Sequence, residues 1–149
     1  MEYHKGNHSV HALQYHLVLV TKYRRKCIYG KLQEFLLADL KRLIEMREGS
    51  VIEINSDLDH VHLLVDLSPK YAIKDVIASI KGSSGRNVKK QFSEILTKFY
   101  KNGDAFWSNS YFISSTGGVS LDIIQKYVED QGKKKRRGRP PKHSSTSHS

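Results

Sequence analysis

Residues 60–67 alternate so regularly that they constrain the fold more than any other stretch of the chain. In a β-strand successive side chains point to opposite faces, so this stretch has one uniformly apolar face, made by Val61, Leu63, Val65 and Leu67. An apolar face of this kind must be buried. The other face carries His60 and His62, about 6–7 Å apart at the backbone and able to converge on one metal ion. Two surface histidines on a half-exposed strand are the alternative.

Periodicity along the rest of the chain predicts six further elements. A strand is expected over 14–20, within an apolar-rich stretch that starts at Ser9, and a second strand over 51–56 forms a hairpin with 60–67. Helices are predicted over 31–47, 73–90 and 120–131, and an aromatic strand over 105–114. The Gly-Ser-Ser-Gly run at 82–85 has poor helix propensity and predicts a kink or break.

The order of these elements defines an α+β fold class. A βαββαβ core is the ferredoxin-like arrangement, an antiparallel sheet with both helices on one face, here followed by a further helix that carries Tyr127. The apolar side of the 60–67 strand is then expected under the helices. His60 and His62 are expected on the open face.

Composition narrows the setting of the protein. The single Cys27 excludes an intramolecular disulfide framework and suits a reducing compartment. The sequence has no apolar run of about 18–20 residues and no signal-peptide pattern at its start, so we expect no membrane span and a cytoplasmic location.

The net charge of +10 is concentrated at the end of the chain. Seven basic residues follow Gly132, whereas no acidic residue does. We therefore expect a domain over 1–131 and a basic, disordered tail over 132–149. Such a tail suits a polyanion such as nucleic acid, or serves only solubility. Its Arg137-Gly138-Arg139-Pro140 run resembles an AT-hook that enters the minor groove of AT-rich duplex DNA, although non-specific phosphate neutralisation is equally open.

The helix expected over 120–131 places Tyr127 and Gln131 on one face, with about 5–6 Å between their Cβ atoms. Two imidazoles and an amide oxygen make an incomplete ligand set that suits Mg²⁺ or Mn²⁺, with phosphate oxygens as the remaining ligands. A metal would then polarise a phosphodiester for attack by the tyrosine oxygen, which forms a covalent intermediate. Because an ordinary tyrosine has a pKa near 10, nearby cationic charge must help to ionise it.

Several ordered motifs together resemble the single-tyrosine HUH transposases, the TnpA-type enzymes of the insertion sequence 200/605 family. The motifs are LQYHLVLVTKYR (13–24), DHVHLL (59–64), FWSNSYF (106–112), Gly117-Gly118 and YVEDQ (127–131). The HxH pair alone is a weak signal, and the ordered set is a strong one.

The resemblance implies a role for each site residue. His60 and His62 match the metal-binding histidines, Gln131 the third ligand and Tyr127 the nucleophile. It also implies a 5′-phosphotyrosine intermediate with a free 3′-OH, by which a single DNA strand is excised and integrated. A homodimer that binds subterminal hairpins of single-stranded DNA is implied, in a prokaryotic cytoplasm and on the nucleoid when DNA-bound. Gly117 and Gly118 become a hinge that lets the tyrosine helix complete the partner's site.

Other residues are expected to have lesser roles. Candidates for DNA contact are His16, Lys22, Arg24, Lys81 and Arg86, with plain solvated charge as the alternative. Asp59 either orients a ligand histidine or caps its turn. Trp107 and Tyr111 are expected in the core rather than as base-stacking platforms. Two rival functions stay open: an HUH nuclease of replication initiation or repeat processing, and a non-catalytic ferredoxin-like nucleic-acid-binding module.

Overall fold

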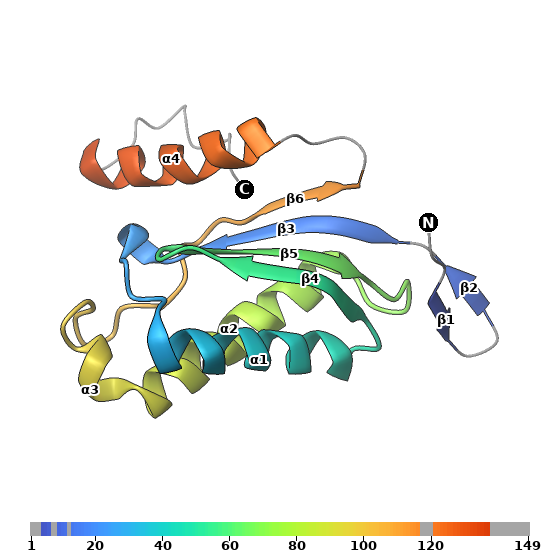
Figure 1. Cartoon of the computed structure of the whole chain (residues 1–149), viewed down its shortest axis with the longest axis horizontal. Helices are drawn as coiled ribbons and strands as arrows, with labels where there is room; N and C mark the ends of the chain where they lie inside the picture. Colours follow the sequence, from blue (N-terminus) through green and yellow to red (C-terminus); the bar gives the residue numbers. More distant parts are fainter. Residues whose placement is uncertain (1–3, 7–8, 12, 117–120, 138–149) are drawn as a thin grey trace.

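The computed structural model describes residues 4–6, 9–11, 13–116 and 121–137. Its centre is a four-stranded sheet in the order β4-β5-β3-β6. The strands are β3 (Gln14–Val20), β4 (Ser50–Ser56), β5 (His60–Asp66) and β6 (Phe112–Ser115). All three strand pairs are antiparallel. In Figure 1, helices α1 (Gly30–Met46) and α2 (Ile73–Gln91) cover one face of this sheet.

The element order β3-α1-β4-β5-α2-β6 confirms the predicted α+β, ferredoxin-like fold. The predicted hairpin of residues 51–56 with residues 60–67 is the β4–β5 pair. β5 lies at the centre because it is apolar on one side along its whole length. Val61, Leu63 and Val65 are completely buried, together with Leu17 and Leu19 of β3 and the apolar faces of α1 and α2.

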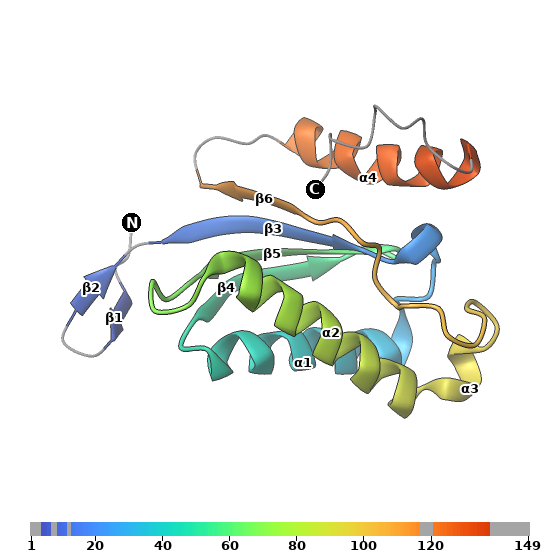
Figure 2. The same cartoon turned by 180° about the vertical axis from the view of Figure 1, so that it is seen from behind.

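Helix α4 (Leu121–Arg137) lies on the opposite face of the sheet, as Figure 2 shows from behind. Ile124 and Val128 of this helix pack on Val18 and Val20 of β3, and the four residues form a second, smaller core. The face predicted to be open is therefore partly covered by the helix that carries Tyr127.

The predicted kink at 82–85 is wrong, because α2 runs unbroken from Ile73 to Gln91. The small residues serve packing instead. Ser84 and Gly85 are buried, and a Cβ on Gly85 would lie 3.4 Å from Cβ of Phe106. Nε1 of Trp107 donates to Oγ of Ser84 at 2.9 Å. The packing of Phe106 and Trp107 on this side of α2 outweighs the weak helix propensity of the run.

Two strand predictions differ from the structure. The predicted strand over 105–114 is only Phe112–Ser115, because Phe106 and Trp107 turn into the core, as expected for Trp107. Tyr111 is partly buried and packs against the same core. The alternating stretch that starts at Ser9 is divided, since Ser9–His11 is a separate strand, β2, paired with β1 (His4–Gly6).

Helix α4 continues six residues beyond Gln131, so the expected helix end there is wrong. Lysine and arginine are good helix formers, and their positive charge is favourable at a helix C-terminus, so residues 133–137 extend the helix past Gly132. Arg137 is helical rather than part of an extended segment. The predictions for Gly117, Gly118 and Arg139 fall outside the described residues. Among the described residues, no helix is long and apolar enough to span a membrane.

The buried bond between Trp107 and Ser84 predicts a coupled effect on stability. Ser84→Ala should cost about 1–3 kcal/mol of unfolding free energy, since it leaves a buried indole N–H without an acceptor. In a Trp107→Phe background the same change should cost much less. Urea unfolding followed by far-UV circular dichroism measures all four variants, with Ser83→Ala as the control on the same helix. Equal costs in the two backgrounds would contradict the coupling.

Candidate functional site

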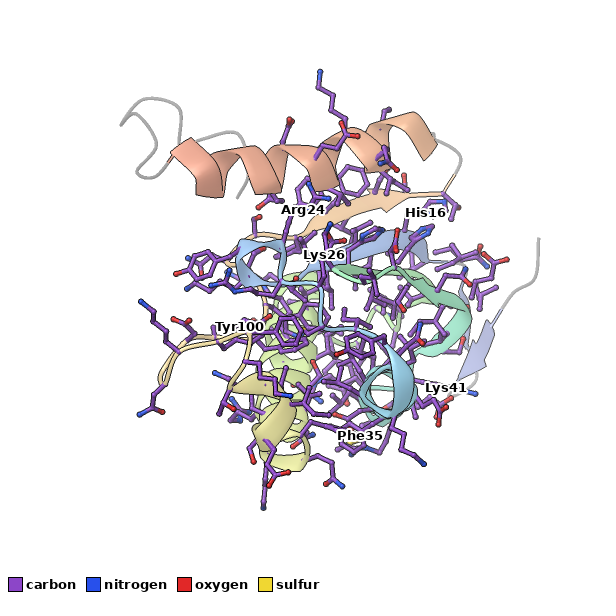
Figure 3. All side chains as sticks on the ribbon, turned by 60° about the vertical axis from the view of Figure 1, so that its left-hand side comes forward. His16, Arg24, Lys26, Phe35, Lys41 and Tyr100 are labelled. Atoms are coloured by element: carbon purple, nitrogen blue, oxygen red, sulfur yellow. The ribbon has the colours of Figure 1, made fainter. Side chains whose placement is uncertain are left out.

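Histidines from two neighbouring strands meet on the α4 side of the sheet. The register places His62 opposite Val18 and His16 opposite Leu64, so the two histidines are diagonal neighbours. Nδ1 of His16 lies 3.0 Å from Nε2 of His62, and the two rings are stacked with centroids 5.2 Å apart. His16, a candidate for DNA contact, thus shares this face with His62, and Figure 3 shows it beneath α4.

Burial and a close neighbour both affect His62. Burial lowers the pKa of its imidazole below the ordinary value, and the nearby His16 lowers it further. His62 therefore stays neutral to lower pH than a free histidine does. A neutral imidazole is the form that ligates a metal ion.

His60 is oriented by a buried carboxylate at the turn before β5. Nδ1 of His60 lies 2.9 Å from Oδ1 of Asp59, and Nε of Arg24 lies 2.9 Å from Oδ2 of the same residue. Burial opposes the ionisation of Asp59, but the hydrogen bonds from His60 and Arg24 outweigh it and lower the pKa of this carboxyl. With Nδ1 donating to Asp59, Nε2 of His60 is the nitrogen left to act as a ligand.

A strained turn brings Arg24 to Asp59. Tyr23 and Arg24, in the short helix η1 (Lys22–Arg24), have φ angles of 62° and 52°, in the left-handed region that non-glycine residues seldom adopt. Thr21, just before the turn, is fully buried and its backbone N–H donates to the Asp59 carbonyl oxygen at 2.9 Å. Arg24, predicted to contact DNA, is thus a partner of Asp59 in this structure.

Tyr127 and Gln131 of α4 share one partner, Ser110. The Tyr127 hydroxyl lies 2.9 Å from Oγ of Ser110, which donates to Oε1 of Gln131 at 3.1 Å. The Tyr127 ring also packs on Phe112, with centroids 5.6 Å apart. Burial raises the pKa of the Tyr127 phenol above its ordinary value, and the bond to Ser110 works in the opposite direction. The predicted pairing of these two side chains on one helical face is present.

Ser110 was not predicted, although it lies within one of the ordered motifs. A serine carries no chemical signal of its own, and only its place before the edge strand β6, next to α4, reveals its role. The segment that contains it is held from below by Lys81 of α2. Nζ of Lys81 donates to the carbonyl oxygens of Ser108, Asn109 and Ser110 at 2.8, 3.2 and 3.4 Å.

The predicted residues therefore form two groups on one face of the sheet. His16, His60 and His62 lie on β3 and β5, and Tyr127 and Gln131 lie on the helix that packs on β3. The remaining candidates lie elsewhere. Lys81 and Arg86 belong to α2, on the other face of the sheet, and Nζ of Lys22 lies 5.6 Å from the centroid of the Tyr23 ring.

The donor atoms fit a divalent metal once His62 and Gln131 exchange their present partners, since Oε1 of Gln131 accepts a hydrogen bond from Ser110. Nε2 of His60 is presented by Asp59, whereas Nε2 of His62 is engaged by His16 and would have to exchange that contact for a metal. Among the described residues, no three His, Cys, Asp or Glu side chains gather into a metal cluster. The protein ligands would then be the two imidazoles and a neutral oxygen such as that of Gln131.

The contact between the two histidines predicts how His62 titrates. Replacement of His16 by Phe keeps a ring over His62 but removes its charge, so the pKa of His62 should rise toward the ordinary value. His16→Ala also relieves burial and should raise it further. NMR titration of the imidazole resonances measures both shifts. An unchanged pKa in His16→Ala would contradict this account of the His62 environment.

Comparison with known proteins identifies the family of the chain. Residues 9–131 match the family model described as "Transposase IS200 like". The chain is 34% identical to the ISDra2 transposase TnpA of Deinococcus radiodurans, over 88% of this chain and 92% of the relative. It is 30% identical to the transposase for insertion sequence element IS200 of Salmonella typhimurium, over 79% and 76% of the two chains.

The fold of this chain also matches that of a solved structure. A crystal structure described as a transposase from Deinococcus radiodurans R1 superimposes with a TM-score of 0.75 and 27% identity, over 86% of this chain and 97% of that one. These matches confirm the resemblance that the ordered motifs indicated. The chain belongs to the IS200-like transposases, the family that moves insertion sequences of the 200/605 type.

Proposed function

We propose that this transposase cleaves and rejoins single-stranded DNA through a covalent bond to Tyr127. One observation carries the proposal: the helix that holds Tyr127 and Gln131 packs on the sheet face that displays His60 and His62. A nucleophile and three neutral metal donors are thereby gathered on one side of the molecule. A plain binding module has no need of this combination.

His60, His62 and Gln131 would hold Mg²⁺ or Mn²⁺. When bound, the ion withdraws charge from the scissile phosphate and orients it for in-line attack. Asp59 fixes the ring of His60 for ligation, and Arg24 keeps Asp59 ionised. The low pKa of His62 keeps its ligand nitrogen unprotonated.

In the cleavage step the oxygen of Tyr127 attacks the phosphorus atom. The new bond joins that oxygen to phosphorus, the bond from phosphorus to the 3′ oxygen breaks, and the 3′ oxygen leaves with a proton as a free 3′-OH. The product is a 5′-phosphotyrosine. Joining is the reverse reaction, in which a 3′-OH attacks the phosphotyrosine and returns the proton to Tyr127.

Tyr127 must lose its proton and leave Ser110 before it attacks. In the docked position its hydroxyl is hydrogen-bonded with Ser110, and burial favours the neutral phenol. Ionisation therefore requires cationic charge near the oxygen or a move of α4 that exposes the phenol to it. The docked helix thus represents a resting arrangement of the nucleophile.

The substrate of this reaction is a single strand with subterminal hairpins, at the ends of an insertion sequence that is excised and integrated. The relatives named as insertion-sequence transposases support this over replication initiation or repeat processing. The sheet face offers histidines and the α4 docking site, and its Phe112 is covered by Tyr127, which does not favour base stacking there.

A covalent adduct tests the proposal directly. Labelled single-stranded DNA that contains the element end and its hairpin should form an SDS-stable adduct with the protein in Mg²⁺ or Mn²⁺. EDTA should abolish the adduct, and Tyr127→Phe should lower its yield by at least about a thousandfold, since no other group forms the bond.

Tyr15→Phe is the matched control, because it removes a hydroxyl of the same type from a side chain that packs against the main core rather than against α4, and it should form the adduct normally. Tyr127→Phe should still bind the DNA. A wild-type protein that binds the element ends but forms no adduct with any divalent metal would overturn the proposal.

We also propose that two chains form a homodimer in which α4 of one subunit completes the histidine site of the other. Among the described residues, the buried core of the contact between α4 and its own sheet consists of Val18, Val20, Ile124 and Val128, with Phe112 and Tyr127 packed beside it. Such a contact is small compared with the main core of the domain and can be exchanged for an equivalent one on a second copy.

Mixed dimers distinguish the two arrangements. His60→Ala and Tyr127→Phe chains are each inactive alone, but a shared site in the mixed dimer combines an intact His60 with an intact Tyr127. About half of the mixed dimers' sites should then form the adduct. If each site is built within one chain, every site keeps a defect, and the absence of adduct would contradict the exchange.

A further inference from the structure

A cleft of about 390 Å³ lies at the edge of the domain, on the α2 side of the sheet. It runs between α2 and the segment 104–109, away from the histidines. Its volume is in the range of clefts that hold one small organic ligand. Its floor is apolar, since Phe106 and Trp107 line it, and its walls are polar. The mechanism proposed above makes no use of it.

The charge around the cleft is positive. Lys81, Arg86 and Lys89 line it against one carboxylate, Asp104. Burial lowers the pKa of Lys81 to about 8, and its Nζ is occupied by the three carbonyl oxygens of 108–110. Arg86 is exposed and Lys89 half-buried, so these two cations are the ones available to an anion.

Glycines open the helix side of the cleft. Gly82 and Gly85 line it, and both come from the run that was expected to break α2. A Cβ on Gly82 would meet only the end of the Arg86 side chain among its nearest neighbours, at 3.2 Å. Gly82 therefore leaves bare helix backbone that a ligand can approach closely, whereas Gly85 is covered by Phe106 and Trp107.

The cleft is one residue away from the nucleophile's partner. Ser108 and Asn109 line it, and the next residue, Ser110, holds Tyr127 and Gln131. Lys81 binds all three carbonyl groups, so the wall of the cleft and the docking point of Tyr127 are parts of one braced segment. A ligand bound in the cleft would therefore lie directly beside the segment that positions Tyr127.

A second cleft, of about 420 Å³, shares Lys89 with the first. It extends toward Lys101 and the turn at Gly103, and Nζ of Lys89 lies 5.8 Å from the centroid of the Tyr100 ring. The two clefts thus make a path along the second half of α2, with cations spaced along it. A polyanionic chain matches such a path better than a single small anion does.

We propose that the first cleft binds one nucleotide of single-stranded DNA, with its phosphate facing Arg86 and Lys89 and its sugar and base against the apolar floor. The neighbouring nucleotide then continues past Lys89 into the second cleft. This proposal rests on DNA as the substrate, but it assigns a binding site on the face away from the histidines. It gives Arg86 a defined place and assigns Lys81 to bracing the wall.

Fluorescence anisotropy of a labelled short oligothymidylate tests the site, with Tyr127→Phe protein as the background so that no cleavage occurs. The double variant Arg86→Ala/Lys89→Ala should weaken binding about tenfold at moderate salt. It should also reduce the slope of log Kd against log salt by about 0.7 for each phosphate that the protein no longer neutralises.

Two further variants distinguish binding in the cleft from general attraction by positive charge. Lys74→Ala/Lys90→Ala removes the same charge from exposed positions of the same helix outside the cleft and should weaken binding much less. Gly82→Leu keeps every charge and suits a helix, but fills the cleft, so it should weaken binding about as much as the removal of Arg86 and Lys89. Thermal unfolding by circular dichroism confirms that each variant is folded.

Two outcomes would overturn the proposed binding site. Equally weakened binding in the two double variants would mean general charge attraction and would overturn the site. Unchanged binding by a folded Gly82→Leu would overturn it as well. Neither result affects the phosphotyrosine adduct of the otherwise wild-type protein, so this proposal and the proposed function fail separately.

Discussion

The antiparallel pairing of β3 with β5 is the contact on which the rest of the structure depends. It aligns two strands that are both apolar toward α1 and α2, and it places His16 and His62 within hydrogen-bond distance on the other face. A shift of one residue would turn every side chain of β5 over, so the core would receive the histidines. Burial of the apolar face therefore sets the register of β5, and with it the relative positions of His16 and His62.

Asp59 links this sheet to the turn at the end of β3. It is buried, and it is kept ionised by hydrogen bonds from both His60 and Arg24. The left-handed backbone at Tyr23 and Arg24 is tolerated because these contacts hold it. The hydrogen bonds to Asp59 therefore both orient His60, a candidate metal ligand, and hold the turn at the end of β3.

Patterns with a strict period predicted most of the fold. The alternation of 60–67 identified the buried face of β5, and the βαββαβ order identified the sheet topology. The predictions that failed depended on contacts between residues that are distant in the sequence. The residues next to Ser84 in the sequence do not indicate that Trp107 will donate to it. The run at 82–85 therefore predicted a kink or break rather than a packing surface. The same limit applies to the site. His60, His62, Tyr127 and Gln131 have chemistry that spacing reveals, whereas Ser110 is recognisable only once α4 is docked beside β6.

The shared bond to Ser110 makes the two α4 groups behave as an interlock. Tyr127 and Gln131 are one helical turn apart and touch the same hydroxyl, so a movement that frees one frees the other. If Tyr127 is the nucleophile and Gln131 a metal ligand, as proposed, a docked helix withholds both and an undocked helix releases both. On that proposal the attacking group would not be released while the amide ligand is still held by Ser110, which would protect the DNA from cleavage by a half-assembled site.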